Sequence, residues 1–475
     1  MDGGLAVVVA IAAALRFATL GQQSFWYDES FTIRLVRGSF GDMLHGVSDT
    51  ESTPPLYYVV AWLWAHVFGS GEVGLRSLSA VCGTGLVLVV FAIGRRLAGR
   101  TAGLLAAALT AVNPLLVWYS QEARSYMLVT LLCAGTVLAW LAAREPGARR
   151  ALAAWALLSA AALATHYFAV FLVAPEAVAL LAFRAGRGRD VWLAVGATAG
   201  AAAALLPLAL TQRERSAFLA VGDVGLGDRA AAVPKQFVLG AFAGELDARW
   251  IVAAAAALGL AAGGLVVLRA RRDRSLAAVA TLAAVALAVP LILALGGADY
   301  LNARNVLIAL PVALAAVGAA AAPGRGAGVL VAGALLLGFG AVDVAVTASD
   351  RLQRDDWRSA AREIGPGRAV VVMSPVGSGA PLGVYAKRLA PAGSGPVPSG
   401  PVWAISLRRP PGPVPAAPPG GPLRAGPLRR TASYLLRRYT LAPGAHLDAN
   451  ALAAKVFPGR PAELARAGGV SGATS

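Results

Sequence analysis

Long apolar stretches, separated by short polar segments, limit the fold of this chain more than any other feature. A helix that spans a membrane needs about 20 apolar residues, and backbone exposed to lipid must satisfy its hydrogen bonds internally. Charged residues make up only 14% of the chain, against about 25% in a soluble domain. The sequence therefore predicts an all-α polytopic membrane protein with about eleven transmembrane helices. The candidate stretches are residues 4–20, 73–93, 101–118, 126–143, 151–166, 168–184, 190–210, 250–269, 276–297, 304–322 and 327–347.

Arginine placement predicts the orientation of these helices. Arginines gather in alternate short loops, and the positive-inside rule assigns such loops to the cytoplasm. The intervening segments, including residues 21–72 and 211–248, then face outward together with the tail. An odd number of spans agrees with an inside N-terminus and an outside C-terminus. The clusters are Arg95, Arg96, Arg100; Arg144, Arg149, Arg150; Arg184, Arg187, Arg189; and Arg269, Arg271, Arg272, Arg274.

Two outward segments are too polar to span the membrane but contain half-apolar stretches. Pro54-Pro55 precedes the stretch 56–68, whose aromatic residues occupy several faces. This composition predicts an interfacial helix that lies on the membrane. A second such element is predicted near residues 230–243.

The tail from about residue 348 has a different composition and predicts a small extracytoplasmic α/β domain after a transmembrane domain of residues 1–347. The tail, residues 348–475, begins with an amphipathic run at 355–358. A Pro/Gly-rich stretch, about 391–423, lacks the pattern of regular structure. Strand candidates are residues 368–373, 402–407 and 434–440.

The net charge of +17 does not by itself indicate a nucleic-acid partner. Arginine far outnumbers lysine, and Ala, Gly and Pro are in excess, a composition typical of GC-rich coding. The sequence has no GxGxxG motif in a βαβ context, no Walker loop and no nucleophile elbow. Nucleotide-driven chemistry therefore has no support, and no cofactor is predicted.

Two adjacent carboxylates, Asp28 and Glu29, follow the first apolar stretch. Carboxylates at the edge of a membrane are costly unless water solvates them or a reaction uses them. An ionised carboxylate beside an acceptor hydroxyl is a general base, and a close pair can tune each other's protonation. The alternative is a hydrated pair that helps to set topology. Together with the motifs below, the pair favours catalysis by Asp28, with Glu29 beside it.

Glu51 and Tyr57 belong to an acidic segment that ends in a double proline. The segment lies on the same predicted side as Asp28, and proline fixes the backbone before the helix that follows. We expect Glu51 and Tyr57 to bind substrate. An ordinary acidic turn before a helix is the alternative.

A third polar group, Gln121, Glu122 and Arg124, joins two spans on the outer side. In a helix Gln121 and Arg124 share a face. Arg124 can bind a phosphate, or it can pair with Glu122 or with an acid of residues 21–72. A solvated hairpin would normally use Gly, Pro or Asn instead, so the pattern favours a substrate site.

Further polar residues are scattered over the outer turns. His166 and Tyr167 separate two spans, and a lone histidine there is more often a satisfied helix-end residue than a ligand. Arg304 is predicted at a helix N-terminus, which favours anions. For the cations, snorkelling to the interface is the alternative. Near one membrane face, Lys235, Arg304 and Asn305 would as a set suit a phosphate. His166 and Tyr167 are further substrate-binding candidates.

Carboxylates and cations at one outer face suit sugar transfer from a lipid-linked donor. A lipid phosphate is a good leaving group that needs a cation rather than a proton, and attack from the opposite face would invert the anomeric centre. Two alternatives stay open: a transporter or flippase for a lipid-linked sugar, and an accessory subunit that binds lipid. Transporters usually place ionisable residues mid-membrane, whereas here they gather at span ends.

The ordered motifs resemble bacterial family 39 glycosyltransferases, relatives of the protein O-mannosyltransferases and of the lipid A aminoarabinose transferase. The resemblance covers about residues 10–310, and the run 353–358 is similar to the start of the tail in the same group. The motifs are Trp26-Tyr27-Asp28-Glu29, Glu51-Ser52-Thr53-Pro54-Pro55-Leu56-Tyr57-Tyr58, Leu75-Arg76-Ser77-Leu78-Ser79, Trp118-Tyr119-Ser120-Gln121-Glu122-Ala123-Arg124 and Thr165-His166-Tyr167-Phe168.

This resemblance implies the GT-C fold and an integral membrane enzyme that uses polyprenyl-phosphate sugars on the outer face. It implies that the catalytic acid is Asp28. Many relatives have His before the double proline where this chain has Thr53, and the resemblance implies no metal. The implied partners are a polyprenyl-phosphate-linked sugar, an acceptor glycan, lipid or protein, and the bilayer of a bacterial plasma membrane.

Overall fold

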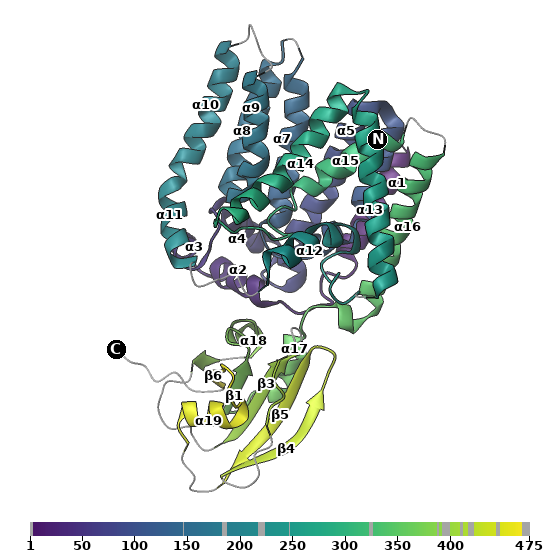
Figure 1. The fold of residues 1–475 in the computed structure, drawn as a ribbon. Coiled ribbons are helices and arrows are strands. Elements are labelled where there is room, and N and C mark those ends of the chain that lie inside the picture. Colours follow the sequence, from purple (N-terminus) through teal and green to yellow (C-terminus); the bar gives the residue numbers. More distant parts are fainter. Residues whose placement is uncertain are drawn as a thin grey trace. The chain divides into compact units, whose positions relative to one another are not determined.

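The computed structural model describes residues 3–145, 147–182, 188–216, 224–246, 248–322, 326–386, 389–391, 400–408, 412–416, 422–442 and 447–467. The chain divides into two compact units (Figure 1). The first unit comprises Met1–Leu20 and Leu35–Ala345, and the second comprises Gly21–Arg34 and Val346–Ser475. The second unit thus includes a short segment from near the N-terminus as well as the tail.

Helices make up the first unit, in agreement with its apolar stretches. In the part of the chain that the structure describes, six helices are long and apolar enough to cross a membrane, and shorter apolar helices accompany them. The exact number of spans remains a prediction. The helices are α1 (Gly3–Phe17), α3 (Phe40–Thr50), α4 (Leu56–Phe68), α5 (Glu72–Ala111), α6 (Pro114–Ser120), α7 (Tyr126–Ala143), α8 (Arg149–Thr165), η1 (Tyr167–Ala169), α9 (Val170–Ala182), α10 (Gly188–Ala204), α11 (Leu206–Ser216), α12 (Leu226–Leu239), α13 (Arg249–Ala270), α14 (Arg274–Leu295), α15 (Ala309–Ala321) and α16 (Ala327–Ala348).

Helix α5 contains one predicted span and most of a second. Its backbone leaves the helical region at Ala98 and Gly99, where Gly99 has φ +82°. The prediction that the second of these spans reaches residue 118 is wrong, because α5 ends at Ala111. Asn113 begins α6 instead: its Oδ1 accepts from the backbone N–H groups of Leu115 and Leu116, and Pro114 occupies the first turn, where a missing N–H costs nothing.

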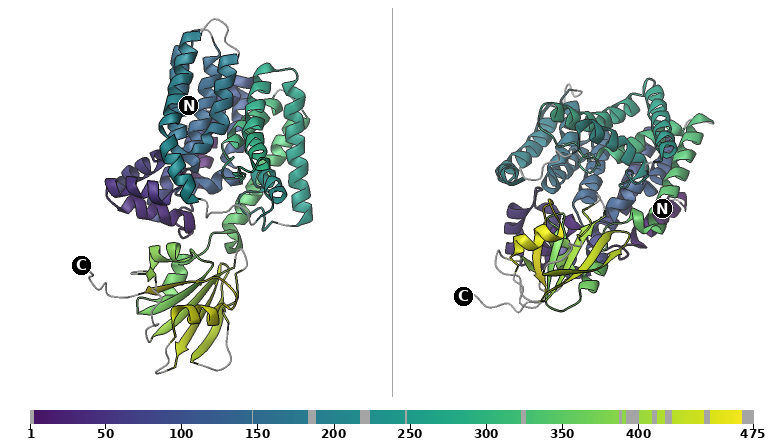
Figure 2. Two further views of the ribbon diagram at one scale, coloured as in Figure 1. Left: turned by 60° about the vertical axis from the view of Figure 1, so that its left-hand side comes forward. Right: turned by 60° about the horizontal axis from the view of Figure 1, so that its bottom comes forward.

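Ion pairs join the arginine-rich loops that the sequence assigns to one membrane side. Arg96, near the bend of α5, pairs with Glu145 after α7. Arg149 Nε donates to Asp190 Oδ2 at 2.8 Å, joining the starts of α8 and α10. Helices α7 to α10 lie side by side in Figures 1 and 2. These basic segments therefore lie at one end of the bundle, and the membrane side that this end faces remains a prediction. Arg184 and Arg187 lie outside the described residues.

A six-stranded sheet forms the centre of the second unit, in the order β2-β6-β1-β3-β5-β4. Strands β1 and β3 are parallel, and the other neighbours are antiparallel. The elements are α2 (Tyr27–Arg37), which begins in this unit, η3 (Asp350–Leu352), α17 (Trp357–Ile364), β1 (Ala369–Ser374), α18 (Gly379–Tyr385), β2 (Ala390–Pro391), β3 (Pro401–Leu407), β4 (Leu423–Arg430), β5 (Tyr434–Leu441), α19 (Ala449–Val456) and β6 (Glu463–Ala467).

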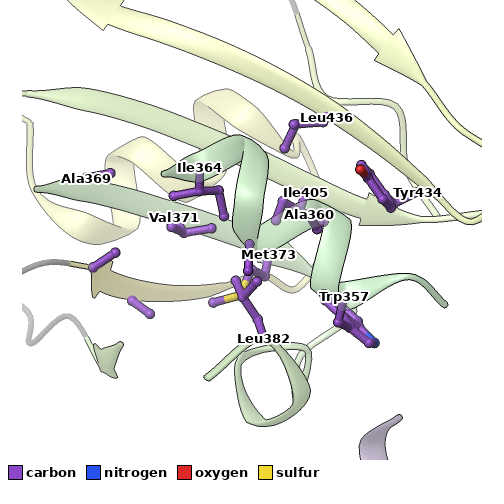
Figure 3. Packing of buried hydrophobic residues seen from close by; sticks show 13 residues of the cluster. Trp357, Ala360, Ile364, Ala369, Val371, Met373, Leu382, Ile405, Tyr434 and Leu436 are labelled. Atoms are coloured by element: carbon purple, nitrogen blue, oxygen red, sulfur yellow. The ribbon is translucent and has the colours of Figure 1, made fainter. Parts of the chain in front are cut away.

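The two faces of this sheet have separate apolar cores. Trp357 and Ile364 of α17 and Leu382 of α18 pack on one face against Val371 and Met373 of β1 (Figure 3). On the other face α19 packs against the alternate residues of β1 and β3. Because successive side chains of a strand point to opposite faces, a sheet covered on both sides needs the nearly continuous apolar pattern that β1 shows.

The tail's predicted strands agree with β1, β3 and β5, and the amphipathic run 355–358 overlaps the start of α17. The strands β2, β4 and β6 and the helices α18 and α19 were not predicted. The expectation that the Pro/Gly-rich stretch lacks regular structure is wrong where β3 forms. Strand β4 contains Gly426-Pro427 and a register shift between Ala425 and Leu428, features that obscure a strand pattern. Of the Pro/Gly-rich stretch, residues 392–399, 409–411 and 417–421 lie outside the described residues.

Residues 21–34 join the second unit through hydrogen bonds to the start of the tail. Ser24 Oγ donates to Asp355 O at 2.6 Å and accepts from Trp357 N at 3.0 Å. Phe25 N donates to the hydroxyl of Tyr385 at 2.6 Å. The segment that carries Asp28 is therefore anchored to the tail rather than being a free loop after α1.

Candidate functional site

The acidic pair lies in the first turn of α2, where the two carboxylates have different surroundings. Glu29 is fully buried, and its Oε2 accepts from the backbone N–H of Trp26 at 3.3 Å, so it caps its own helix. Asp28 is half-buried. Burial, followed by the charges of Asp28 and Glu463, raises the pKa of Tyr27. A helix N-terminus stabilises an ionised carboxylate, and of the pair Asp28 is the one with access to solvent.

Arg124 and Glu51 form a buried, bidentate ion pair in the first unit. Arg124 Nη1 donates to Glu51 Oε1 at 3.0 Å, and Nη2 donates to Oε2 at 2.9 Å. The side chains are 9% and 3% exposed. From the sequence, Glu122 and an acid of residues 21–72 were the candidate ion-pair partners of Arg124, and this ion pair is with an acid of residues 21–72.

The local fold explains how these two residues meet. Glu51 ends α3, and its N–H donates to Val47 O at 3.3 Å. Arg124 lies in the buried turn between α6 and α7. Tyr58 of α4 lies beside the pair, with its ring centroid 6.0 Å from Arg124 Cζ, and its hydroxyl is 3.3 Å from Thr53 Oγ1. Neither Thr53 nor Tyr58 was among the predicted substrate-binding residues.

His166 is a buried, neutral histidine close to two arginines. The N–H of Phe168 donates to its Nδ1 at 3.3 Å, so the ring proton of the neutral form is on Nε2. Burial, followed by the positive charges of Arg124 and Arg304, lowers the pKa of His166 to about 3. The centroid of the His166 ring lies 5.9 Å from that of Tyr126 and 4.9 Å from that of Phe168.

Three predicted substrate-binding residues contribute to packing in the same region. The Gln121 Nε2 donates to Leu15 O and to Thr19 Oγ1, both at 2.8 Å, and so holds the end of α1. Glu122 is buried, and its backbone carbonyl accepts from Ser79 Oγ at 2.6 Å. Tyr57 is buried beside Tyr58 in an edge-to-face contact with centroids 5.3 Å apart.

Tyr167 points to a residue that the sequence did not single out, Gln212 of α11. The Tyr167 hydroxyl donates to Gln212 Oε1 at 2.8 Å. Gln212 is 2% exposed. A glutamine that follows a long apolar stretch was the available signal, but it is weak because such residues also end helices without a ligand.

The prediction that Arg304 starts a helix is wrong, because α15 begins at Ala309. Asn302 Oδ1 accepts from the N–H of Arg304 at 3.2 Å and stabilises a turn. Asn305 Nδ2 donates to Tyr300 O at 2.8 Å in the same turn. Pro311 then falls in the first turn of α15, where proline is tolerated.

Lys235 lies in α12, which packs on the segment that contains Arg304. Val233 of α12 belongs to one apolar cluster with Leu301, Ala303 and Val306. Arg229 of the same helix pairs with Asp299, with Nη1 and Oδ1 2.7 Å apart. The hydrogen bond from Arg229 lowers the pKa of Asp299. This packing places Lys235 and Arg304 on two adjoining elements.

The structure thus brings together part of the predicted site. Glu51, Arg124, His166 and Arg304 interact in the first unit, whereas Asp28 and Glu29 belong to the second. Among the described residues, no group of three or more His, Cys, Asp or Glu side chains could hold a metal ion. Independence from metals remains a prediction.

Known proteins similar to this chain include one sequence family and several solved structures. Residues 52–210 match the model of a family described as dolichyl-phosphate-mannose-protein mannosyltransferase. ArnT from Cupriavidus metallidurans, solved with undecaprenyl phosphate, has a TM-score of 0.52 at 13% identity, over 92% of this chain and 98% of that chain. The archaeal oligosaccharyltransferase AglB from Archaeoglobus fulgidus, solved with an inhibitory peptide and a dolichol-phosphate, has a TM-score of 0.50 at 11% identity, over 80% of this chain and 63% of that chain. No curated protein sequence matches the chain.

The class that follows is a multi-pass membrane protein with the GT-C glycosyltransferase fold and a small C-terminal α/β region. The resemblance to glycosyltransferases of the protein O-mannosyltransferase and ArnT type, expected from the sequence, is confirmed. The matched residues 52–210 include Arg124, His166 and Tyr167 and begin one residue after Glu51.

Proposed function

We propose that this protein is an inverting glycosyltransferase that moves a sugar from a polyprenyl-phosphate donor to an acceptor hydroxyl. The observation that carries the proposal is the group of Arg124, His166 and Arg304. They lie close enough together for both arginines to depress the pKa of the histidine. Two cations around a neutral N–H donor suit an anionic leaving group. The group lies in a GT-C fold, and Arg124 and His166 fall within the residues that match the mannosyltransferase family.

The proposed reaction needs one base and one anion-binding site. The acceptor oxygen attacks the anomeric carbon and transfers its proton to the Asp28 carboxylate, and the bond between that carbon and the phosphate oxygen breaks. The lipid phosphate departs with the bonding electrons, held by Arg124, Lys235 and Arg304. Glu51 orients Arg124. Inversion follows because the acceptor attacks opposite the phosphate.

The other predicted site residues have supporting roles in this proposal. Glu29 caps the helix that presents Asp28, and His166 offers its Nε2–H to the donor. The acceptor is a glycan, lipid or protein. The proposed setting is a bacterial plasma membrane, with the site and the C-terminus on the extracytoplasmic side. This sidedness is inferred from the positive-inside rule, which assigns the arginine-rich loops to the cytoplasm.

The test is a sugar-transfer assay with a radiolabelled polyprenyl-phosphate sugar in proteoliposomes, with and without acceptor. Asp28→Asn should abolish transfer while the protein still accumulates in the membrane. Asp49→Asn, which changes an exposed acid of α3, serves as the matched control. Full turnover by Asp28→Asn would remove the assignment of the base. Movement of label across the bilayer without a change in its chemistry would instead identify a flippase.

The phosphate site has a separate test. Lys235→Ala and Arg304→Ala should each weaken donor binding, because each removes a positive charge from the leaving group. Arg213→Ala, which removes an exposed cation of α11, controls for general charge effects. Unchanged donor affinity in both site variants would rule out their role in binding phosphate.

A further inference from the structure

The side chain of Gln212 uses its whole amide group in hydrogen bonds inside the first unit. Its Nε2 donates to Val47 O at 2.9 Å and to Thr53 O at 3.1 Å. Its Oε1 accepts from the Tyr167 hydroxyl at 2.8 Å. The partners are 165, 159 and 45 residues away in the sequence. A buried amide that satisfies both donors and its acceptor fixes all of its partners in one arrangement.

Each partner is next to a residue of the candidate site. Val47 O also accepts from the N–H of Glu51 at 3.3 Å. Thr53 follows Glu51 by two residues, and its hydroxyl is 3.3 Å from that of Tyr58. Tyr167 follows His166 directly. Gln212 therefore connects the segment that carries Glu51 to the turn that carries His166.

We propose that Gln212 is a positioning residue for the lipid-phosphate site. By holding Val47 O and Thr53 O it fixes the backbone on both sides of Glu51. Glu51 in turn holds both terminal nitrogens of Arg124, so the position of Gln212 determines where the guanidinium lies. Through Tyr167 it fixes the turn that carries His166. This inference rests on the proposed function, since it assigns Gln212 to the donor half of that reaction.

An effect on donor binding separates positioning from a general role in folding. Partial unfolding lowers the number of active molecules, which reduces the maximal rate and leaves the KM of the remaining molecules unchanged. A displaced Arg124 instead weakens the interaction with the donor phosphate and raises the donor KM. Loss of a hydrogen bond to a charged or buried group corresponds to about a tenfold change in an equilibrium constant.

The experiment measures steady-state sugar transfer by the full chain in proteoliposomes, with donor and acceptor varied in turn. Gln212→Met keeps the length of the side chain and removes all three hydrogen bonds. Gln212→Glu keeps the acceptor for Tyr167 and replaces the donor amide. We expect both variants to raise the donor KM by about tenfold and to leave the acceptor KM unchanged.

Two further variants make the test specific. Thr198→Val removes a buried hydroxyl of the preceding helix α10, whose Oγ1 donates to Ala194 O at 3.0 Å, and it should leave both KM values unchanged. Gln212→Met combined with Glu51→Gln should raise the donor KM by less than the product of the two single effects, because both act through Arg124.

The outcomes separate this inference from the function on which it rests. If the unmodified protein transfers no sugar, the proposed function fails. The second outcome starts from an active unmodified protein and an inactive Asp28→Asn variant. If both Gln212 variants then have the same donor KM as Thr198→Val, only the positioning role is overturned. A fall in maximal rate with unchanged KM would also overturn it. If Gln212→Met does not accumulate in the membrane, Gln212→Glu and Tyr167→Phe decide, each with an expected rise in donor KM.

Discussion

Arg124 and Glu51, 73 residues apart in the sequence, form a bidentate ion pair. Each terminal nitrogen of the guanidinium donates to one oxygen of the carboxylate. Neither side chain is more than 9% exposed. Taking two charges out of water is costly, and close bidentate geometry offsets that cost. The pair therefore holds a guanidinium at a fixed place in the buried part of the first unit, which suits an anion-binding site better than a flexible surface arginine would.

Replacement of Arg124 by lysine should show how much the bidentate geometry of the ion pair contributes to stability. A lysine keeps the charge but cannot contact both carboxylate oxygens, so Arg124→Lys should lose about 1–3 kcal/mol of stability. The measurement is the apparent melting temperature in detergent. Arg149→Lys is the control, because the Arg149–Asp190 pair has side chains 82% and 36% exposed, and surface pairs contribute about 0–1 kcal/mol. Equal losses in both variants would contradict the expectation.

Gly83 of α5 provides room for a buried arginine of α1. Arg16 donates from Nη1 to Ala111 O at 2.8 Å and from Nη2 to Thr110 O at 3.1 Å, at the last carbonyls of α5. Its Nε donates to Ser120 Oγ at 3.1 Å. A Cβ on Gly83 would lie 2.1 Å from that Oγ and 2.9 Å from Nε. Such distances require the arginine network to move.

Gly83→Ala should therefore lower stability by about 1–3 kcal/mol, the usual cost of overpacking a core. Gly85→Ala, two residues further along α5, is the control: the nearest atom to its added Cβ is Leu131 Cδ2 at 3.8 Å, an ordinary contact. Both changes gain the same helix propensity, so the difference between their melting temperatures isolates the crowding. A Gly83→Ala protein as stable as Gly85→Ala would show that the network shifts without cost.

The buried His166 should make the folded protein sensitive to acid. Its pKa falls from 6.5 to about 3 on folding. Between those values the unfolded chain binds a proton that the folded chain does not, so stability decreases as pH falls through this window. His166→Asn, which carries no titrating ring, should lose stability at neutral pH but should lose less on acidification.

The measurement for this prediction is the difference in melting temperature between the unmodified protein and His166→Asn, followed from about pH 7.5 to about pH 5. The difference should shrink as the pH falls. His45→Asn changes an exposed histidine of α3 and controls for general effects. A difference that stays constant with pH would mean that His166 does not resist protonation.

Ser24 should stabilise the attachment of the N-terminal segment to the tail. Its hydroxyl both donates to Asp355 O and accepts from Trp357 N, so Ser24→Ala leaves two backbone groups without that partner. We expect a loss of about 1–3 kcal/mol in the local stability of residues 355–358, measured by hydrogen exchange. Ser48→Ala, at an exposed bond from Oγ to His45 O, is the control. Unchanged exchange in the Ser24 variant would mean that this bond does not hold the segment.

The expectations that came closest to the structure rest on local chemistry. Apolar stretches predict helices because each membrane helix satisfies its own backbone, and the stretch 56–68 agrees with α4 residue for residue. The apolar pattern of 368–373 and the acidic start of α17 likewise depend on neighbours in the chain. Where two local signals competed, the predicted helix bounds were wrong. Asn113-Pro114 starts a new helix, so α5 ends before the predicted residue 118, and the turn at Asn302 precedes α15, which begins after the predicted residue 304.

The sequence by itself determined the membrane character, most helices and the residue types of the site, because hydrophobicity, capping and charge act over a few residues. Only the tertiary structure decided that Arg124 pairs with Glu51 and that Gln212 forms hydrogen bonds with Val47 and Tyr167. It also decided that residues 21–34 pack with the tail. These are contacts between distant segments. Which contacts form depends on which buried polar groups meet once the helices have packed, and the residues adjacent to each group in the sequence do not indicate its distant partner.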